Sequence, residues 1–226
     1  ECVQLLLQHS PNMQVLMSDS YGWTALMHAC ENGMDACVSL LLCHDPRRQV
    51  GKIASNGWNA LMMACENGNT RTVSMLLEHA PTQQVCMMTL DNYTALMYAC
   101  ENGATDCVSL LLQHAPDEQV RIRSTNGFTA LMYACENDAY RCVSLLLRHT
   151  PEKQVCMTDS EGGTALMYAC ESGAHRCISL LLEHIPDEQV PMIDSEGWTA
   201  YMIACKNGHS KCMELLMRHR TCISLS

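Results

Sequence analysis

A ten-residue stretch recurs six times at an unbroken period of 35 residues, and this regularity constrains the fold more than any other feature of the chain. The third copy, Thr94–Gly103, reads TALMYACENG. A fixed period of about 20 to 50 residues is typical of proteins built from stacked repeats, in which each module packs only against its neighbours. We therefore predict an all-α solenoid of stacked helix-turn-helix repeats. The copies begin at Thr24, Asn59, Thr94, Thr129, Thr164 and Thr199.

Each copy is predicted to fold as turn, helix, turn, helix and loop. Thr94 suits a helix N-cap, because its hydroxyl can accept a hydrogen bond from a backbone N–H of the first turn. Apolar residues follow at helical spacing, and Gly103 suits the left-handed position that ends this helix. A second apolar helix is predicted from Asp106 to about His114. It ends before Pro116, which cannot continue a helix, and the histidine near its end suits a capping role.

The period divides one predicted domain, 1–226, into modules. Residues 1–18 match only the second helix and loop of a repeat, so we expect a monomer with at most weak end-to-end association through their unpartnered apolar side chains. The chain opens with Glu1, which suggests a piece of a longer protein. Residues 194–226 are expected to cap the solenoid, because Lys206 and further basic residues make this copy more polar. The full repeats are 19–53, 54–88, 89–123, 124–158 and 159–193.

The charge balance and the hydropathy pattern exclude several classes of partner. The net charge is -10, so a phosphate backbone would repel the chain and nucleic acid is not expected as a partner. No apolar run approaches the roughly 18 residues that span a bilayer, so membrane insertion is not expected either.

The 16 cysteines follow the repeat rather than a disulfide pattern. Two columns, which include Cys100 and Cys107, lie inside the apolar helical runs, where a free thiol behaves as a small hydrophobic residue. This pattern indicates reduced core thiols in a reducing compartment, the cytoplasm. A bridge within each repeat, such as Cys100 to Cys107, and a redox or metal role of the columns are the alternatives. They are disfavoured because Cys65 has only Thr72 opposite it and no repeat shows CxxC spacing.

The repeated pattern Gly-x-Thr-x-Leu-x-x-Ala-x-x-x-Gly, followed by Val-x-Leu-Leu-Leu-x-His, resembles the ankyrin repeat over essentially the whole chain. It is a 35-residue, TALM-type variant, with Ala95 and Met97 in place of the Pro and His of the family's T-P-L-H-x-A motif. The residues Pro-Asp-Glu-Gln after the second helix suit a short additional helical turn. The resemblance implies a curved solenoid with short β-hairpin fingers, whose first helices and finger tips line a concave binding face. It also implies protein binding, with no catalysis and no cofactor.

Two aromatic columns fall on the face that the resemblance makes concave. One precedes the N-cap and the other lies within the first helix. Aromatic side chains are frequent anchors of binding sites, although each ring could instead merely cover the hairpin of its own repeat. The columns contain Trp23, Trp58, Tyr93, Phe128 and Trp198, with a gap at Gly163, and His28, Tyr98, Tyr133 and Tyr168.

An acidic column runs beside the aromatic columns. A row of like charges would favour basic partners and speed their association, whereas the alternative is a solvated helix end. The column consists of Glu31, Glu66, Glu101, Glu136 and Glu171, and Lys206 occupies the sixth position.

The sequence therefore predicts a scaffold that binds a protein or peptide, possibly basic, through the aromatic and acidic columns. Every recurring Cys and His falls in a structural column, and there is no phosphate-binding glycine loop or nucleophile elbow, so an enzyme is not expected. The alternative is a targeting or regulatory arm of a larger enzyme, for example a kinase.

Overall fold

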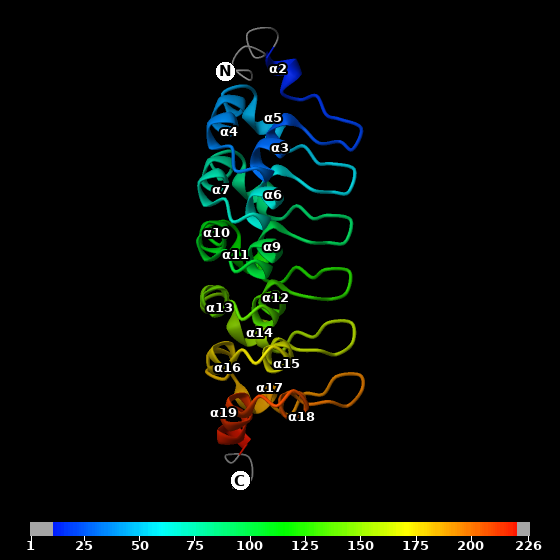
Figure 1. Cartoon of the computed structure of the whole chain (residues 1–226), viewed down its shortest axis with the longest axis vertical. Coiled ribbons are helices and arrows are strands. Elements are labelled where there is room, and N and C mark those ends of the chain that lie inside the picture. The colour runs from blue at the N-terminus through cyan, green and yellow to red at the C-terminus, as the bar shows by residue number, and fades with distance from the viewer. Residues whose placement is uncertain (1–10, 221–226) are drawn as a thin grey trace. The chain divides into compact units, whose positions relative to one another are not determined.

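The structure, a computed structural model, describes residues 11–220, so the predicted helix of the N-terminal partial repeat lies outside the described residues. The described residues form two compact units, one of residues 11–99 and 106–115 and the other of residues 100–105 and 116–220. In each unit, a projecting hairpin followed by helices recurs along the chain. Figure 1 shows this pattern at α3 and again at α6. Between Pro11 and Arg220 no helix combines the length and the apolar composition that crossing a bilayer requires.

The first helix of each repeat begins after the predicted N-cap. Thr24 Oγ1 accepts the N–H of Met27 at 3.3 Å, and Asn59 Oδ1 accepts that of Met62 at 2.9 Å. The same bond recurs in the other four copies. These helices are α3 (Ala25–Glu31), α6 (Ala60–Glu66), α9 (Ala95–Glu101), α12 (Ala130–Glu136), α15 (Ala165–Glu171) and α18 (Ala200–Lys206).

The second helices pack against the first helices and against each other within each unit, as for α4 with α3 and with α7. Leu61, Cys65, Val73 and Leu76 are completely buried, which confirms that the repeated apolar residues form the core. The second helices are α4 (Asp35–Leu42), α7 (Thr70–Leu77), α10 (Thr105–Leu111), α13 (Tyr140–Leu146), α16 (His175–Leu181) and α19 (Ser210–Arg220).

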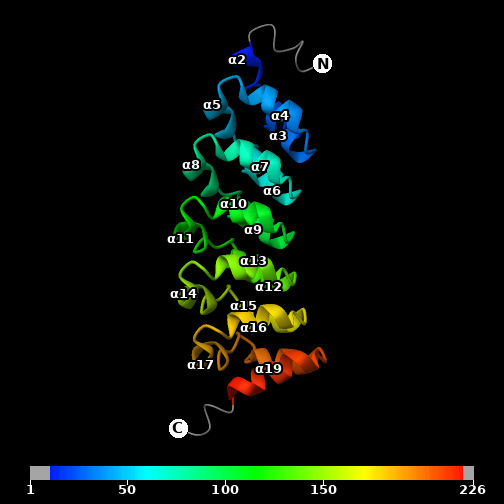
Figure 2. The same ribbon diagram turned by 90° about the vertical axis from the view of Figure 1, so that its left-hand side faces the viewer.

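A short third helix follows each second helix from α4 to α16, as the Pro-Asp-Glu-Gln residues predicted, and lies to one side of the second helices (Figure 2). The proline was predicted to end the second helix, but it begins the third helix instead. The second helix α7 ends at Leu77, before Ala80 turns into the left-handed region at φ 49°, and Pro81 then begins α8 at a first helical position. The third helices are α2 (Pro11–Gln14), α5 (Pro46–Val50), α8 (Pro81–Val85), α11 (Pro116–Gln119), α14 (Pro151–Val155) and α17 (Pro186–Gln189).

A buried glutamine joins the second and third helices, and sequence reasoning did not single it out. The side-chain amide of Gln84 donates to the carbonyl of Leu76 at 2.8 Å and to that of His79. Leu76 lies in the last turn of α7 and His79 lies just beyond its end, where backbone carbonyls lack donors from a continuing helix. Equivalent pairs of bonds are made by Gln49, Gln154 and Gln189.

Replacing Gln84 by leucine is expected to lower the free energy of unfolding by about 1–3 kcal/mol, because the carbonyl of His79 loses its side-chain donor and that of Leu76 keeps only the N–H of His79. Gln83→Leu is the matched control, since Gln83 is exposed on the same short helix and its replacement should change stability by less than about 0.5 kcal/mol. Urea unfolding of both variants measures the difference. Equal stabilities would show that the buried amide does not support this junction.

Short fingers precede the first helices and are joined tip to tip by backbone hydrogen bonds. In the first unit, the N–H of Ser55 donates to the carbonyl of Tyr21 at 2.9 Å, and in the second the N–H of Ser195 donates to that of Glu161 at 2.7 Å. Isolated antiparallel bridges such as that between Ser18 and Thr24 close three of the fingers. The predicted hairpins are therefore present as short fingers, and the described residues contain no extended sheet.

Candidate functional site

The two aromatic columns interleave in the first unit. The ring of Tyr98 lies between Trp58, at a centroid distance of 4.4 Å, and Tyr93, at 5.2 Å. Trp23 stacks in the same way on His28 of its own repeat, at 5.0 Å. Trp23 and Tyr93 thus each pack on a ring of their own first helix, whereas Trp58 reaches the ring of the next repeat. All five side chains keep part of their surface exposed.

The same interleaving recurs in the second unit. Phe128 contacts Tyr133 of its own repeat at 5.1 Å and Tyr168 of the next repeat at 4.7 Å. Tyr133 is almost fully covered, with 6% of its surface exposed, so it is the least available of the predicted binding residues. At the last copy, the ammonium group of Lys206 lies 4.8 Å from the centre of the Trp198 ring, a cation–π contact.

The gap in the aromatic column at Gly163 is partly filled by Tyr168. A Cβ atom added to Gly163 would lie 2.8 Å from the Tyr168 hydroxyl, which donates a hydrogen bond to Asp159. Burial, followed by this carboxylate, raises the pKa of Tyr168 above its ordinary value. A hollow of about 280 Å³ remains beside the glycine, with Glu171 and Asp194 among its lining residues.

Three aspartates at the start of fingers are functional candidates that the sequence reading missed. Asp19 Oδ1 accepts the N–H groups of Tyr21 and Trp23, each at 2.9 Å, and its Oδ2 lies 3.2 Å from Nε2 of His28. These bonds, led by that from Trp23, lower the pKa of Asp19. The recurring Asp-Ser before the turn glycine, at Asp19, Asp159 and Asp194, was the signal in the sequence.

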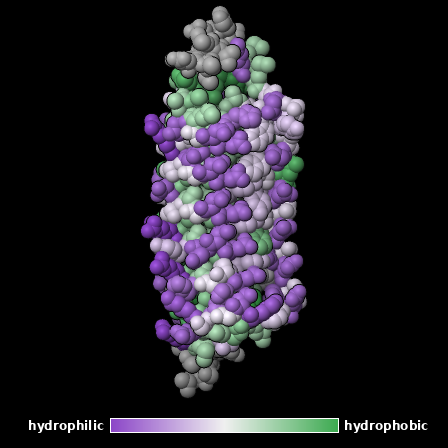
Figure 3. All heavy atoms as spheres, viewed as in Figure 1, coloured by the Kyte–Doolittle hydropathy of each residue, from purple (hydrophilic) through white to green (hydrophobic). Residues whose placement is uncertain are grey.

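The acidic column forms a row along the first helices of each unit. Burial and then the neighbouring Glu31 raise the pKa of Glu66 in the first unit. In the second unit, burial raises the pKa of Glu136, and Glu101 and Glu171 on either side raise it further. The space-filling view shows rows of hydrophilic residues across the face where first and second helices lie (Figure 3). These carboxylates therefore repel one another, and a bound cation would relieve that repulsion.

Glu136→Gln is expected to stabilise the protein at neutral pH by about 0.3 kcal/mol, because the glutamate there is ionised against burial and like charges. A pKa raised by folding contributes stability below the unfolded pKa and loses it as the pH rises through the folded value. The gain should therefore disappear at acidic pH, where Glu136 is protonated. Thermal unfolding across this pH range measures it, with Glu152→Gln on α14 as a control for charge alone. A gain that is independent of pH would contradict the explanation.

The described cysteines are all free thiols, and most belong to the core. The thiols that interact with Cys65 lie in the adjacent repeats, Cys107 in the following one and Cys30 in the preceding one. Cys135 likewise interacts with Cys177 of the following repeat and with Cys100 of the preceding one. These contacts join different repeats, whereas the alternative of a bridge requires a pair within one repeat. Among residues 11–220, no group of three or more His, Cys, Asp or Glu side chains is placed to bind a metal ion.

Taken residue by residue, the structure brings most of the predicted site together within each unit. Most of the aromatic residues pack on a neighbouring ring, and the glutamates lie on the same first helices. Such a surface can stack against apolar or planar groups and attract positive charge.

Comparison with protein families supports the architecture. A family model described as "Ankyrin repeats (3 copies)" matches residues 1–50, 43–121, 81–159 and 149–225, which together span nearly the whole chain. No match was found among curated proteins.

Proposed function

The chain belongs to the ankyrin repeat family, and we propose that it is a scaffold that binds a protein or peptide partner through the aromatic and acidic face of its fingers and first helices. Ankyrin repeats are in general protein–protein interaction modules. We further propose that this face is the binding surface and that the partner segment is basic, and we assign the chain no catalysis of its own. The core position of the thiols fits a reducing compartment such as the cytoplasm.

The observation that carries the proposal is the partly exposed aromatic stack beside the glutamate row. Trp58, Tyr98 and Tyr93 form one continuous stack whose rings stay accessible in part. Beside it, burial and the neighbouring Glu31 raise the pKa of Glu66. Accessible rings supply anchoring contacts, and the unbalanced negative charge favours a basic segment.

Affinity capture from the cell that makes the protein, followed by mass spectrometry, tests the proposal. The wild-type chain and a face variant, Trp58→Ala with Glu66→Gln, serve as parallel baits, so that proteins retained by both can be discarded. We expect at least one partner that is retained only by the wild type and whose smallest binding segment is basic. Partners that are retained equally by both baits would place the binding surface elsewhere.

A further inference from the structure

A hollow of the first unit lies beside the finger of the first full repeat. Its volume is about 440 Å³. Five of its lining residues belong to this repeat: Asp19, Tyr21, Trp23, His28 and Glu31. The other two, residues 55–56, belong to the tip of the next finger. The hollow therefore combines aromatic rings with two carboxylates, and none of its lining residues is Lys or Arg.

Two of these residues distinguish this repeat from the other copies. Tyr21 is the only aromatic residue in its column, and His28 is the only histidine in its own. A position that only supports the fold keeps its residue type from copy to copy. A position that selects one partner must differ between copies. The columns read Tyr21, Asn56, Asp91, Asn126, Glu161 and Glu196, and His28, Met63, Tyr98, Tyr133, Tyr168 and Ile203.

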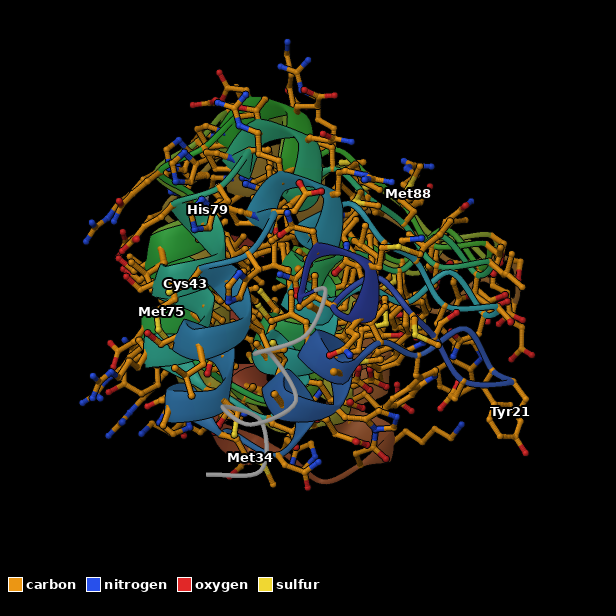
Figure 4. All side chains as sticks on the ribbon, turned by 90° about the horizontal axis from the view of Figure 1, so that it is seen from above. Tyr21, Met34, Cys43, Met75, His79 and Met88 are labelled. Atoms are coloured by element: carbon orange, nitrogen blue, oxygen red, sulfur yellow. The ribbon has the colours of Figure 1, made fainter. Side chains whose placement is uncertain are left out.

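The rings of the hollow offer surfaces for stacking. Trp23 is partly exposed, with its ring packed on His28 at 5.0 Å. Tyr21 is 72% exposed and stands at the end of its finger, on the opposite side of the unit from Cys43, Met75 and His79 (Figure 4). A planar group that entered the hollow could therefore lie between an anchored indole and an outer phenol ring.

The two carboxylates of the hollow differ in their capacity to accept further hydrogen bonds. Asp19 uses one oxygen for two backbone N–H groups and the other for His28. Glu31 is less engaged, because Asn32 Nδ2 lies 3.5 Å from its Oε2 and His28 Nδ1 lies 3.9 Å from the same oxygen. Its side chain is 43% exposed. Glu31 is thus the carboxylate with room for a donor from a ligand.

We propose that this hollow binds an arginine side chain of the partner, with its guanidinium stacked on Trp23 and Tyr21 and hydrogen-bonded to Glu31. A guanidinium is planar, always charged and weakly hydrated, so it stacks on aromatic faces and presents a fork of donors to a carboxylate. An ammonium group matches the charge but not the flat aromatic walls. The inference rests on the proposed function, because it names one anchor of the basic segment.

A direct test uses a small probe and the full chain. Nα-acetyl-arginine methylamide is titrated to about 20 mM while the indole N–H signal of Trp23 is followed by NMR, since single-contact ligands bind in the millimolar range. The three tryptophan signals are assigned with single Trp→Phe variants. We expect a saturable shift of the Trp23 signal and about tenfold weaker binding of the citrulline analogue, an uncharged near-isostere. Glu31→Gln should weaken arginine binding about as much, and Glu152→Gln on α14, outside the proposed face, should leave it unchanged. A Trp23 signal that does not move would overturn the inference.

A second measurement separates this inference from the proposed function. Each arginine of the captured binding segment is replaced in turn by citrulline, and affinities are measured for wild type and for Glu31→Gln. We expect one arginine whose replacement costs about tenfold with the wild type and almost nothing with Glu31→Gln. If the segment binds and no arginine couples to Glu31, the inference fails while the proposed function stands. If no partner is captured, the proposed function fails and the NMR titration alone decides whether the hollow binds arginine.

Discussion

Replacement of Gly57 by alanine is expected to lower the free energy of unfolding by about 3–5 kcal/mol, because backbone strain and a steric clash act at one position. Gly57 has a φ of +86°, in the left-handed region that disfavours a side chain. A Cβ atom there would lie 2.7 Å from Cα of Thr89 and 2.8 Å from N of Leu90. Both atoms belong to the backbone of the next finger, so neither can move aside by a change of rotamer.

Gly197→Ala provides a matched control for that result. Its φ is +82°, nearly that of Gly57, but no atom lies within 4 Å of the added Cβ. Only the strain remains, so we expect a loss of about 1–2 kcal/mol. Chemical unfolding of both variants separates the two contributions. Equal losses would contradict the close approach of adjacent fingers.

Replacement of Trp58 by alanine is expected to weaken partner binding at least about 30-fold, which corresponds to roughly 2 kcal/mol for an aromatic anchor. The Trp58 ring contacts Tyr98 at 4.4 Å, so its loss removes a contact surface and releases the neighbouring ring. Trp58→Phe keeps a ring in this place and should retain most of the affinity. Isothermal titration with the purified partner segment measures both variants.

Tyr140 supplies the control for loss of an aromatic residue in general. It lies on the second helix α13, where its ring contacts the guanidinium groups of Arg141 and Arg176. Tyr140→Ala should therefore leave partner binding unchanged, whatever it does to stability. If Tyr140→Ala and Trp58→Ala weaken binding equally, the aromatic face has no special role.

The backbone of the repeat was predictable because its residues have strong local preferences. Threonine or asparagine caps, a glycine at positive φ and a proline at a first helical position each favour one conformation. Asp138 replaces the helix-ending glycine in one copy, and it adopts the same left-handed conformation at φ 51°. The short third helix followed from the same local preferences.

The side-chain network was less predictable, because its partners are distant in sequence or in the loops. The amide of Gln84 reaches carbonyls five and eight residues away, and nothing in the apolar pattern marks it as buried. The pairing of Cys65 with Cys107 crosses from one repeat to the next. The aromatic columns could be identified from the sequence, but the interleaving of Phe128 with Tyr168 depends on the packing of adjacent repeats.

If the fingers and first helices carry the binding surface, partner binding should protect their backbone N–H groups from hydrogen exchange. Hydrogen exchange of the free and partner-bound chain measures this, because each backbone N–H reports on its own surroundings. We expect new protection in residues 54–58 and in the first helices α6 and α9, with little change in the third helices α5 and α8. Protection confined to α5, α8 and the second helices would contradict it.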